Sequence, residues 1–172
     1  MLLVALTAAA SAHSVTGAFG YALGRAPGAT ATSCYHATYP SKATSYICPG
    51  DGFFQRISIR AQRNQVTDLT GMRTYRQPRE VALRTCSAEL ARVAANVRRT
   101  HPALLPMPMY KAPDFWLSEA ALDGRVPTGR SIIGKCSVLT PRPGGDTAML
   151  SLTYALSTHD KVTLINQDKA GK

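Results

Sequence analysis

The sequence lacks the short motifs that would identify an enzyme or a nucleotide-binding protein. It has no G-x-S-x-G and no H-E-x-x-H, and it has neither a P-loop nor a G-x-G-x-x-G turn. It has no C-x-x-C pair, so its cysteines do not resemble a zinc module. No apolar run approaches the roughly 18 residues that a membrane-spanning helix needs. We therefore favour a non-enzymatic protein without a transmembrane helix, and we expect no cofactor.

Acidic residues are scarce, with 10 Asp and Glu against 20 Lys and Arg and a net charge of +10. The segment 56–99 holds ten arginines, no lysine and three acidic residues. Guanidinium groups bind phosphate, sulfate and carboxylate through paired hydrogen bonds, so this segment suits an anionic ligand. Arg84, Arg92 and Arg99 are the candidate residues for such a patch. The alternative is a solvated basic face without a ligand.

The N-terminus is an apolar stretch that ends in Ala10-Ser11-Ala12, the small-residue pattern that signal peptidases accept. We expect residues 1–12 to be a signal peptide and the mature protein to be secreted or periplasmic. The alternative is an apolar N-terminal helix packed on the domain. For an exported protein, an anionic glycan or a protein partner is favoured over nucleic acid, so nucleic acid is disfavoured as a partner.

Four cysteines behind an export signal favour two disulfides. Three pairings are open. We favour Cys34–Cys48, which closes a short loop, together with Cys86–Cys136, which would tie a helix to the C-terminal third.

The length of 172 residues suits one domain with an N-terminal extension. Residues 13–52 are rich in small residues without periodicity, and we expect an irregular arm closed by a disulfide. We expect residues 53–168 to form a single α+β domain. Within it, alternation predicts strands at 53–60 and 66–75, and apolar residues at three- and four-residue spacing predict a helix over 78–100.

The C-terminal third supplies the remaining elements. Residues 131–139 and 161–165 read as strands. Residues 147–158 are ambiguous because Leu150, Leu152 and Leu156 alternate with polar residues as in a strand, while Asp146 is a good helix N-cap and the length suits a helix.

The order of parts from Gly129-Arg-Ser-Ile-Ile133 through Cys136, Met149-Leu150 and Tyr154-Ala-Leu156 to Val162-Thr-Leu164 resembles the B subunits of subtilase cytotoxin and pertussis-type toxins. Those are small secreted OB-fold proteins that form pentamers and bind host-surface glycans. The resemblance implies that residues 147–158 are an amphipathic helix. The expected fold is therefore α+β, with a small OB-like unit, this helix and the Arg-rich helix at 78–100. A mainly β sandwich or barrel is the alternative.

A sugar site needs an aromatic face with a few fixed polar groups. Trp116, Tyr110 and Asp114 form the one compact cluster of that kind in the sequence, although the sole tryptophan also suits simple core packing. A minor alternative uses His13, which would become the first residue after cleavage and resembles the copper ligand of secreted polysaccharide oxidases. His36, His101 and His159 are its candidate partners.

The preferred function is non-enzymatic binding of a carbohydrate or an anionic surface ligand, with association into a homo-oligomer as a further expectation. The competing hypothesis is a structural or accessory subunit of a larger extracellular or membrane-associated assembly. The prolines of residues 101–113 suit a chain that is ordered by its neighbours.

Overall fold

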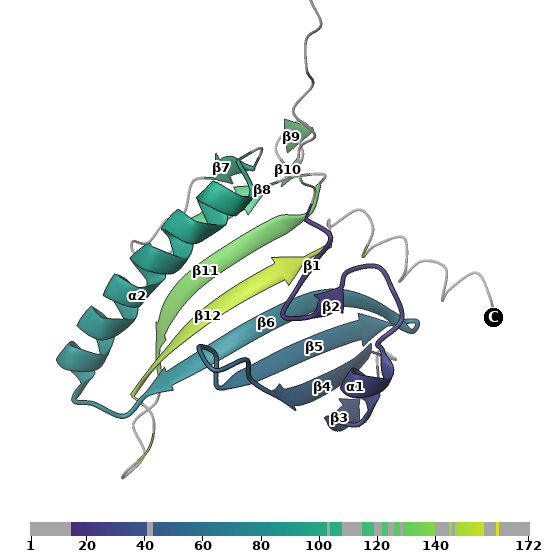
Figure 1. Cartoon of the computed structure of the whole chain (residues 1–172), viewed down its shortest axis with the longest axis horizontal. Coiled ribbons are helices and arrows are strands. Elements are labelled where there is room, and N and C mark those ends of the chain that lie inside the picture. The colour runs from purple at the N-terminus through teal and green to yellow at the C-terminus, as the bar shows by residue number, and fades with distance from the viewer. Residues whose placement is uncertain are drawn as a thin grey trace, which may run out of the picture.

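The structure is a computed structural model that describes residues 15–40, 43–102, 104–107, 115–118, 122–123, 126–127, 129–139, 145, 147–156 and 161. Its main element is an eight-stranded antiparallel sheet in the order β3-β4-β5-β6-β12-β11-β8-β7 (Figure 1). The strands, in that order, are Tyr35–Thr38, Ala43–Pro49, Arg56–Gln62, Gln65–Tyr75, Ala148–Ala155, Ser131–Val138, Phe115–Ser118 and Leu105–Met107. Two small hairpins add β1 (Gly17–Ala18) with β2 (Tyr21–Ala22), and β9 (Leu122–Asp123) with β10 (Val126–Pro127).

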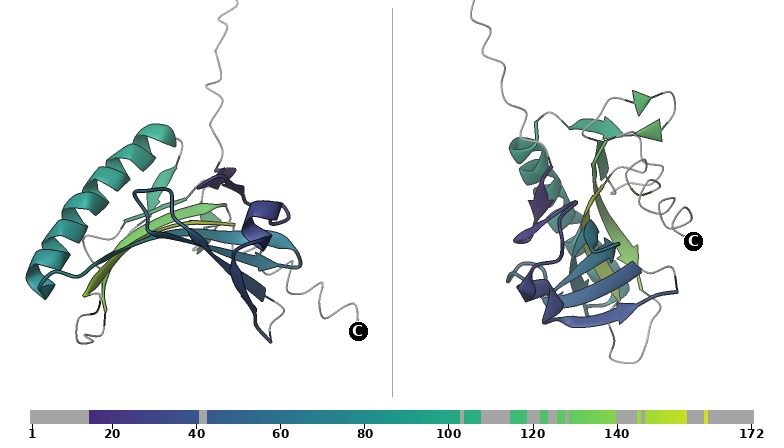
Figure 2. Two further views of the ribbon diagram at one scale, coloured as in Figure 1. Left: turned by 60° about the horizontal axis from the view of Figure 1, so that its bottom comes forward. Right: turned by 90° about the vertical axis from the view of Figure 1, so that its right-hand side faces the viewer.

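The helices α1 (Ala29–Thr32) and α2 (Arg79–Thr100) lie on one face of the sheet. Figure 2 shows both helices and the β1–β2 hairpin on the same side, with the other side of the sheet inside an arch and covered by no described helix. None of the described helices is long and apolar enough to cross a membrane.

The predicted helix at 78–100 is confirmed as α2. Its packed side carries Cys86, Leu90 and Val97, which are almost fully buried. Arg98 and Arg99 occupy the last turn, where cations interact favourably with the helix dipole. The helix packs on β11 and β12, and the disulfide between Cys86 and Cys136 attaches it to β11.

The predicted strands before α2 are β5 and β6. They pair through a two-residue turn in which Arg63 and Asn64 have φ of 51° and 57°. Both central residues of a type I′ turn need positive φ, and this turn matches the right-handed twist of the strands. Ile57 and Ile59 alternate into the core, as their spacing predicted.

The helix expected at 147–158 is wrong. Residues 148–155 form β12, which pairs with β6 on one side and β11 on the other. Leu150, Leu152 and Tyr154 point to the helix-covered face, so a period of two buries them all, whereas a helix would turn them to different sides. An OB-like unit is not confirmed, because the described sheet is open, with β3 and β7 at its edges. The coarser α+β class stands.

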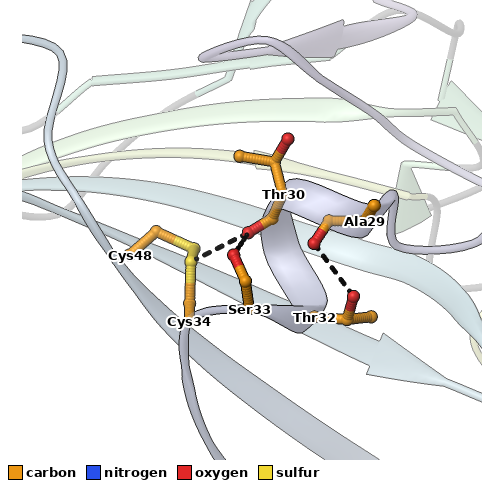
Figure 3. Close-up of a disulfide and its surroundings, with 6 residues drawn as sticks. All are labelled: Ala29, Thr30, Thr32, Ser33, Cys34 and Cys48. Atoms are coloured by element: carbon orange, nitrogen blue, oxygen red, sulfur yellow. Dashed lines mark hydrogen bonds between the residues drawn. A yellow bond between two sulfur atoms is a disulfide. The ribbon is translucent and has the colours of Figure 1, made fainter.

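The arm expected to be irregular at 13–52 is largely ordered. β3 and β4 extend the main sheet, with Ile47 and Cys48 opposite Ser58 and Ile57 of β5. The favoured disulfide pairing is the one observed, with Cys34 bonded to Cys48 directly after α1 (Figure 3). A side chain satisfies a backbone carbonyl at the C-terminal end of α1, because Ser33 Oγ donates a hydrogen bond to the Thr30 carbonyl at 2.8 Å.

Other expectations fall partly or wholly outside the described residues. The signal peptide at 1–12 lies outside them, as does the strand expected at 161–165 apart from Lys161. Trp116 lies on the short strand β8, Phe115–Ser118.

Candidate functional site

A cavity of about 510 Å3 lies between α2, the β1–β2 hairpin and the covered face of the sheet. We call it the aromatic cavity. Four aromatic side chains from distant parts of the chain line it: Phe19, Phe53, Phe54 and Tyr154. Val93, Val97 and Leu152 add aliphatic surface, and Glu89, Arg92 and Asn96 of α2 are its charged and amide groups. Small-molecule sites are concave, mostly apolar and equipped with a few fixed polar groups, which this cavity matches.

Phe19 enters the aromatic cavity from a strained turn. It has φ of 56°, and Gly20 follows with φ of 80°, in the two residues that join β1 to β2. Side chains other than glycine, asparagine and aspartate are uncommon at positive φ, so something must hold Phe19 there. Its ring packs edge-to-face on Phe54 at 5.3 Å and on Tyr154 at 5.7 Å between centroids. Aromatic packing therefore offsets the backbone strain.

Gly71 makes room for these rings on the sheet. A Cβ at this position would lie 2.7 Å from two ring atoms of Phe54 and 2.8 Å from Cζ of Phe19. Gly71 pairs with Leu152 on β12 and Ile57 on β5, in the middle of the sheet. The glycine inside a predicted strand thus marks a close approach of aromatic side chains to the backbone.

The turn before β5 sets the positions of Phe53 and Phe54. The sequence Pro49-Gly-Asp-Gly52 predicts a turn there, and Gly52 has φ of 100°. The Phe54 amide donates to Asp51 Oδ1 at 3.0 Å, which closes the turn. Phe54 is buried, whereas Phe53 is 40% exposed. Phe53 is therefore the ring available to a ligand.

Arg73 connects this turn to α2. Its Nε lies 2.8 Å from Oε2 of Glu89, and its Nη1 donates to the Phe53 carbonyl at 2.8 Å. Its guanidinium also lies 5.1 Å from the centroid of the Phe53 ring, a cation–π contact. The ion pair is only partly exposed, so it is screened less than a surface pair. Arg73 thereby fixes both Phe53 and Glu89.

Tyr75 completes this network. Its hydroxyl donates to Oε2 of Glu89 at 2.7 Å. Burial raises the pKa of the Tyr75 phenol well above its usual range, and the hydrogen bond to the Glu89 carboxylate adds to the increase. Burial also raises the pKa of Tyr154. Both phenols therefore stay neutral at any pH where the protein would work.

The raised phenol pKa values predict a loss of stability in strong alkali. A phenol whose pKa is higher in the folded than in the unfolded state contributes stability below about pH 10, and the contribution is lost as pH rises through the folded-state pKa. We expect the free energy of unfolding, measured by urea denaturation, to fall above about pH 10 and to fall less steeply in Tyr75→Phe. A free energy that rises above that pH, or an equally steep fall in the variant, would contradict this.

The rim of the aromatic cavity on α2 carries residues at positions i, i+3 and i+7. Arg92 is exposed and has no partner among the described residues. Asn96 accepts a hydrogen bond at its Oδ1 from Arg99 at 2.7 Å, and its amide nitrogen has no partner among the described residues. The contacts of Glu89 in the described part of the chain all use Oε2, which leaves Oε1. The rim thus offers a cation, an amide donor and a carboxylate oxygen.

The structure divides the predicted arginine patch. Arg92 lines the aromatic cavity and Arg99 contacts its rim through Asn96. Arg84 is exposed two turns earlier, and eight residues at 100° each turn it about 80° from Arg92 around the helix. Only the later two residues therefore belong to one site.

The other predicted sites are not assembled in the described part of the chain. Trp116 lies on β8, but its side chain is outside the described residues, as are Tyr110 and Asp114. His13 and His159 are outside them too. His36 is on the edge strand β3, whereas His101 ends α2 near Tyr154. The described residues contain no group of three metal-binding side chains.

Sequence reasoning missed the aromatic residues of the cavity. Phe19, Phe53 and Tyr154 are separated by up to 135 positions, and no local pattern links them. The turn signal before Phe53 and the glycine at 71 were visible, but neither shows which rings they admit.

The chain matches no family model, no curated protein and no solved structure.

Proposed function

We propose that this is an exported, non-enzymatic binding protein that holds an acidic carbohydrate in the aromatic cavity. The observation that carries the proposal is the pairing of an aromatic wall with the guanidinium of Arg92 at its rim, which has no partner among the described residues. The two disulfides are consistent with a secreted protein.

The wall and rim suit a sugar ring. Sugars present an apolar face of C–H groups that packs on aromatic rings, and Phe53 offers exposed aromatic surface. Hydroxyl groups need donors and acceptors in fixed positions. Asn96 and Glu89 supply one of each, and both are held by neighbours, since Arg99 contacts Asn96 and Arg73 contacts Glu89. A preorganised site loses less entropy on binding.

The charge of the rim favours an acidic sugar. Arg92 can form paired hydrogen bonds to a carboxylate or sulfate, which a lysine cannot. Its neighbour Arg99 adds a second positive charge, whereas Glu89 is already neutralised by Arg73. The net charge of +10 steers anionic ligands toward the protein as a whole.

The open edge of the sheet favours a second candidate, a subunit of a larger assembly or homo-oligomer. Edge strands are usually protected by charge, proline or bulges. β3 (Tyr35–Thr38) has no charged residue or proline, and Tyr35 is 76% exposed. The resemblance to toxin B subunits stays a prediction, and the strand β12 lies where that resemblance implied a helix. The copper site at His13 also stays a prediction.

Binding to a defined sugar pair tests the proposed function. Oligogalacturonate and its methyl ester have the same rings and differ in charge. We expect the wild type to prefer the acid and Arg92→Gln to lose about tenfold in affinity for it, with little change for the ester. Phe53→Ala should weaken both. Isothermal titration calorimetry measures each affinity.

Arg84→Gln is the matched control, because it removes the same charge from the same helix outside the cavity. We expect it to bind like the wild type. An equal loss in Arg84→Gln and Arg92→Gln would show a general charge effect and contradict the proposal. Absence of binding to both sugars in the wild type would also contradict it.

A further inference from the structure

The face of the sheet opposite α2 contains a second concave site that the proposed function does not use. It is a hollow of about 710 Å3 on β4, β5, β6 and β12, which we call the open-face hollow. Its polar residues are Gln55, Arg56, Thr74 and Arg76. Its apolar residues are Ile47, Met72 and Met149. The described lining therefore contains two guanidinium groups and no carboxylate.

The register of the sheet extends this positive charge across four strands. Arg56 pairs with Met72, Met72 with Ser151, and Ser151 with Lys135. Directly paired residues point to the same face, so Arg56 and Lys135 stand at the two ends of one row. Three strand spacings separate them, about 14 Å. We call this line of four residues, which has a cation at each end, the cation row.

On this face of the sheet, no acidic side chain among the described residues pairs with Arg56 or Lys135. Asp68 is the acidic residue that the described strands place on it, and its carboxylate is bound by Lys161. Arg56 is exposed and has no partner among the described residues. Charge complementarity therefore selects an anionic occupant.

The wall beside Arg56 is held in place. Oε1 of Gln55 accepts hydrogen bonds from the amide of Thr74 at 2.9 Å and from its hydroxyl at 2.8 Å. This side-chain bridge joins the start of β5 to the end of β6. Ser151, in the middle of the cation row, has a buried Oγ with no hydrogen-bond partner. The row therefore contains a buried hydroxyl whose hydrogen-bonding capacity the described residues do not use.

We infer that the open-face hollow and the cation row bind a sulfated polysaccharide that lies across the strands. Arginine pairs well with sulfate, and two cationic residues whose backbone positions are about 14 Å apart suit a chain that carries several anions along its length. The strands that line the hollow belong to a sheet that curves into an arch (Figure 2), and a rod-shaped chain fits the inner side of an arch better than a flat membrane does. Its described lining has no aromatic ring for stacking bases, which disfavours single-stranded nucleic acid.

The test is binding of dextran sulfate at physiological salt, with neutral dextran as the reference. We expect the double variant Arg56→Gln/Arg76→Gln to lose tenfold or more in affinity, roughly the effect of removing charge-assisted hydrogen bonds. Lys135→Gln should lose less, because it stands at the end of the row. The matched control is Arg79→Gln/Arg84→Gln, which removes two exposed arginines from α2 and should bind almost as tightly as the wild type.

Three outcomes would overturn the inference. One is an equal loss of affinity in both double variants, which would show that binding depends on total charge and not on the open-face hollow. Another is unchanged binding in Arg56→Gln/Arg76→Gln when circular dichroism shows it folded. The third is binding of single-stranded DNA as tight as dextran sulfate with the same dependence on Arg56 and Arg76. Arg92→Gln should bind dextran sulfate as the wild type does. A wrong inference about the open-face hollow can therefore be distinguished from a wrong proposal about the aromatic cavity.

Discussion

Replacing Cys86 and Cys136 by alanine is expected to lower the free energy of unfolding by about 4 kcal/mol. The disulfide closes a loop with a sequence separation of 50, so its removal restores much conformational entropy to the unfolded chain. The same bond attaches α2 to β11, and α2 carries the polar rim of the aromatic cavity. Urea denaturation measures the loss.

The second disulfide supplies the comparison for this prediction. Cys34–Cys48 has a sequence separation of 14, for which the same chain-entropy relation gives about 3 kcal/mol. The Cys34→Ala/Cys48→Ala variant should keep affinity for an acidic sugar, because neither residue lines the cavity. A Cys86→Ala/Cys136→Ala variant as stable as the wild type would contradict the predicted effect.

Replacing Gly71 by alanine is expected to destabilise the protein by about 2 kcal/mol and to weaken binding in the aromatic cavity. The new methyl group would overlap the rings of Phe54 and Phe19, which must then move away from the sheet. Phe19 is in a positive-φ turn that its ring contacts hold, so its displacement also releases the turn. Thermal unfolding and sugar affinity report the two effects.

Gly28→Ala is the control for this substitution. A Cβ at Gly28 meets no atom within 4 Å, and the residue has φ of −68°. We expect this variant to match the wild type in both measurements. If Gly71→Ala is equally stable and binds equally well, the rings do not pack on the sheet as described.

Hydrophobic periodicity predicted the elements whose apolar face is encoded within a single segment of the sequence. The spacing of Cys86, Leu90 and Val97 predicts α2 because one helix face alone must be apolar. Alternation likewise predicts β5. β12 shows the opposite case, because its alternation was correct but the toxin-like order of parts favoured a helix. Its status as a central strand depends on β11, which precedes it in the chain, and on β6, which pairs with it from a distant part of the sequence.

The aromatic cavity depends on contacts of the same long range. Charge alone does not distinguish Arg92 from Arg84 in the sequence. In the fold, Arg92 lines the same cavity as Phe53, whereas Arg84 does not line it. The β1–β2 hairpin brings Phe19 to the sheet from a segment that looked irregular. No spacing rule relates a hairpin tip to a helix face, so the site emerges only from the fold.

Nuclear magnetic resonance mapping of a bound acidic sugar tests the central claim most directly. Amide chemical shifts of the 15N-labelled protein are followed while oligogalacturonate is added. We expect the largest changes at Phe19, Phe53, Arg92 and Asn96, around the aromatic cavity. Changes confined to other parts of the surface, or none at saturating sugar, would contradict it.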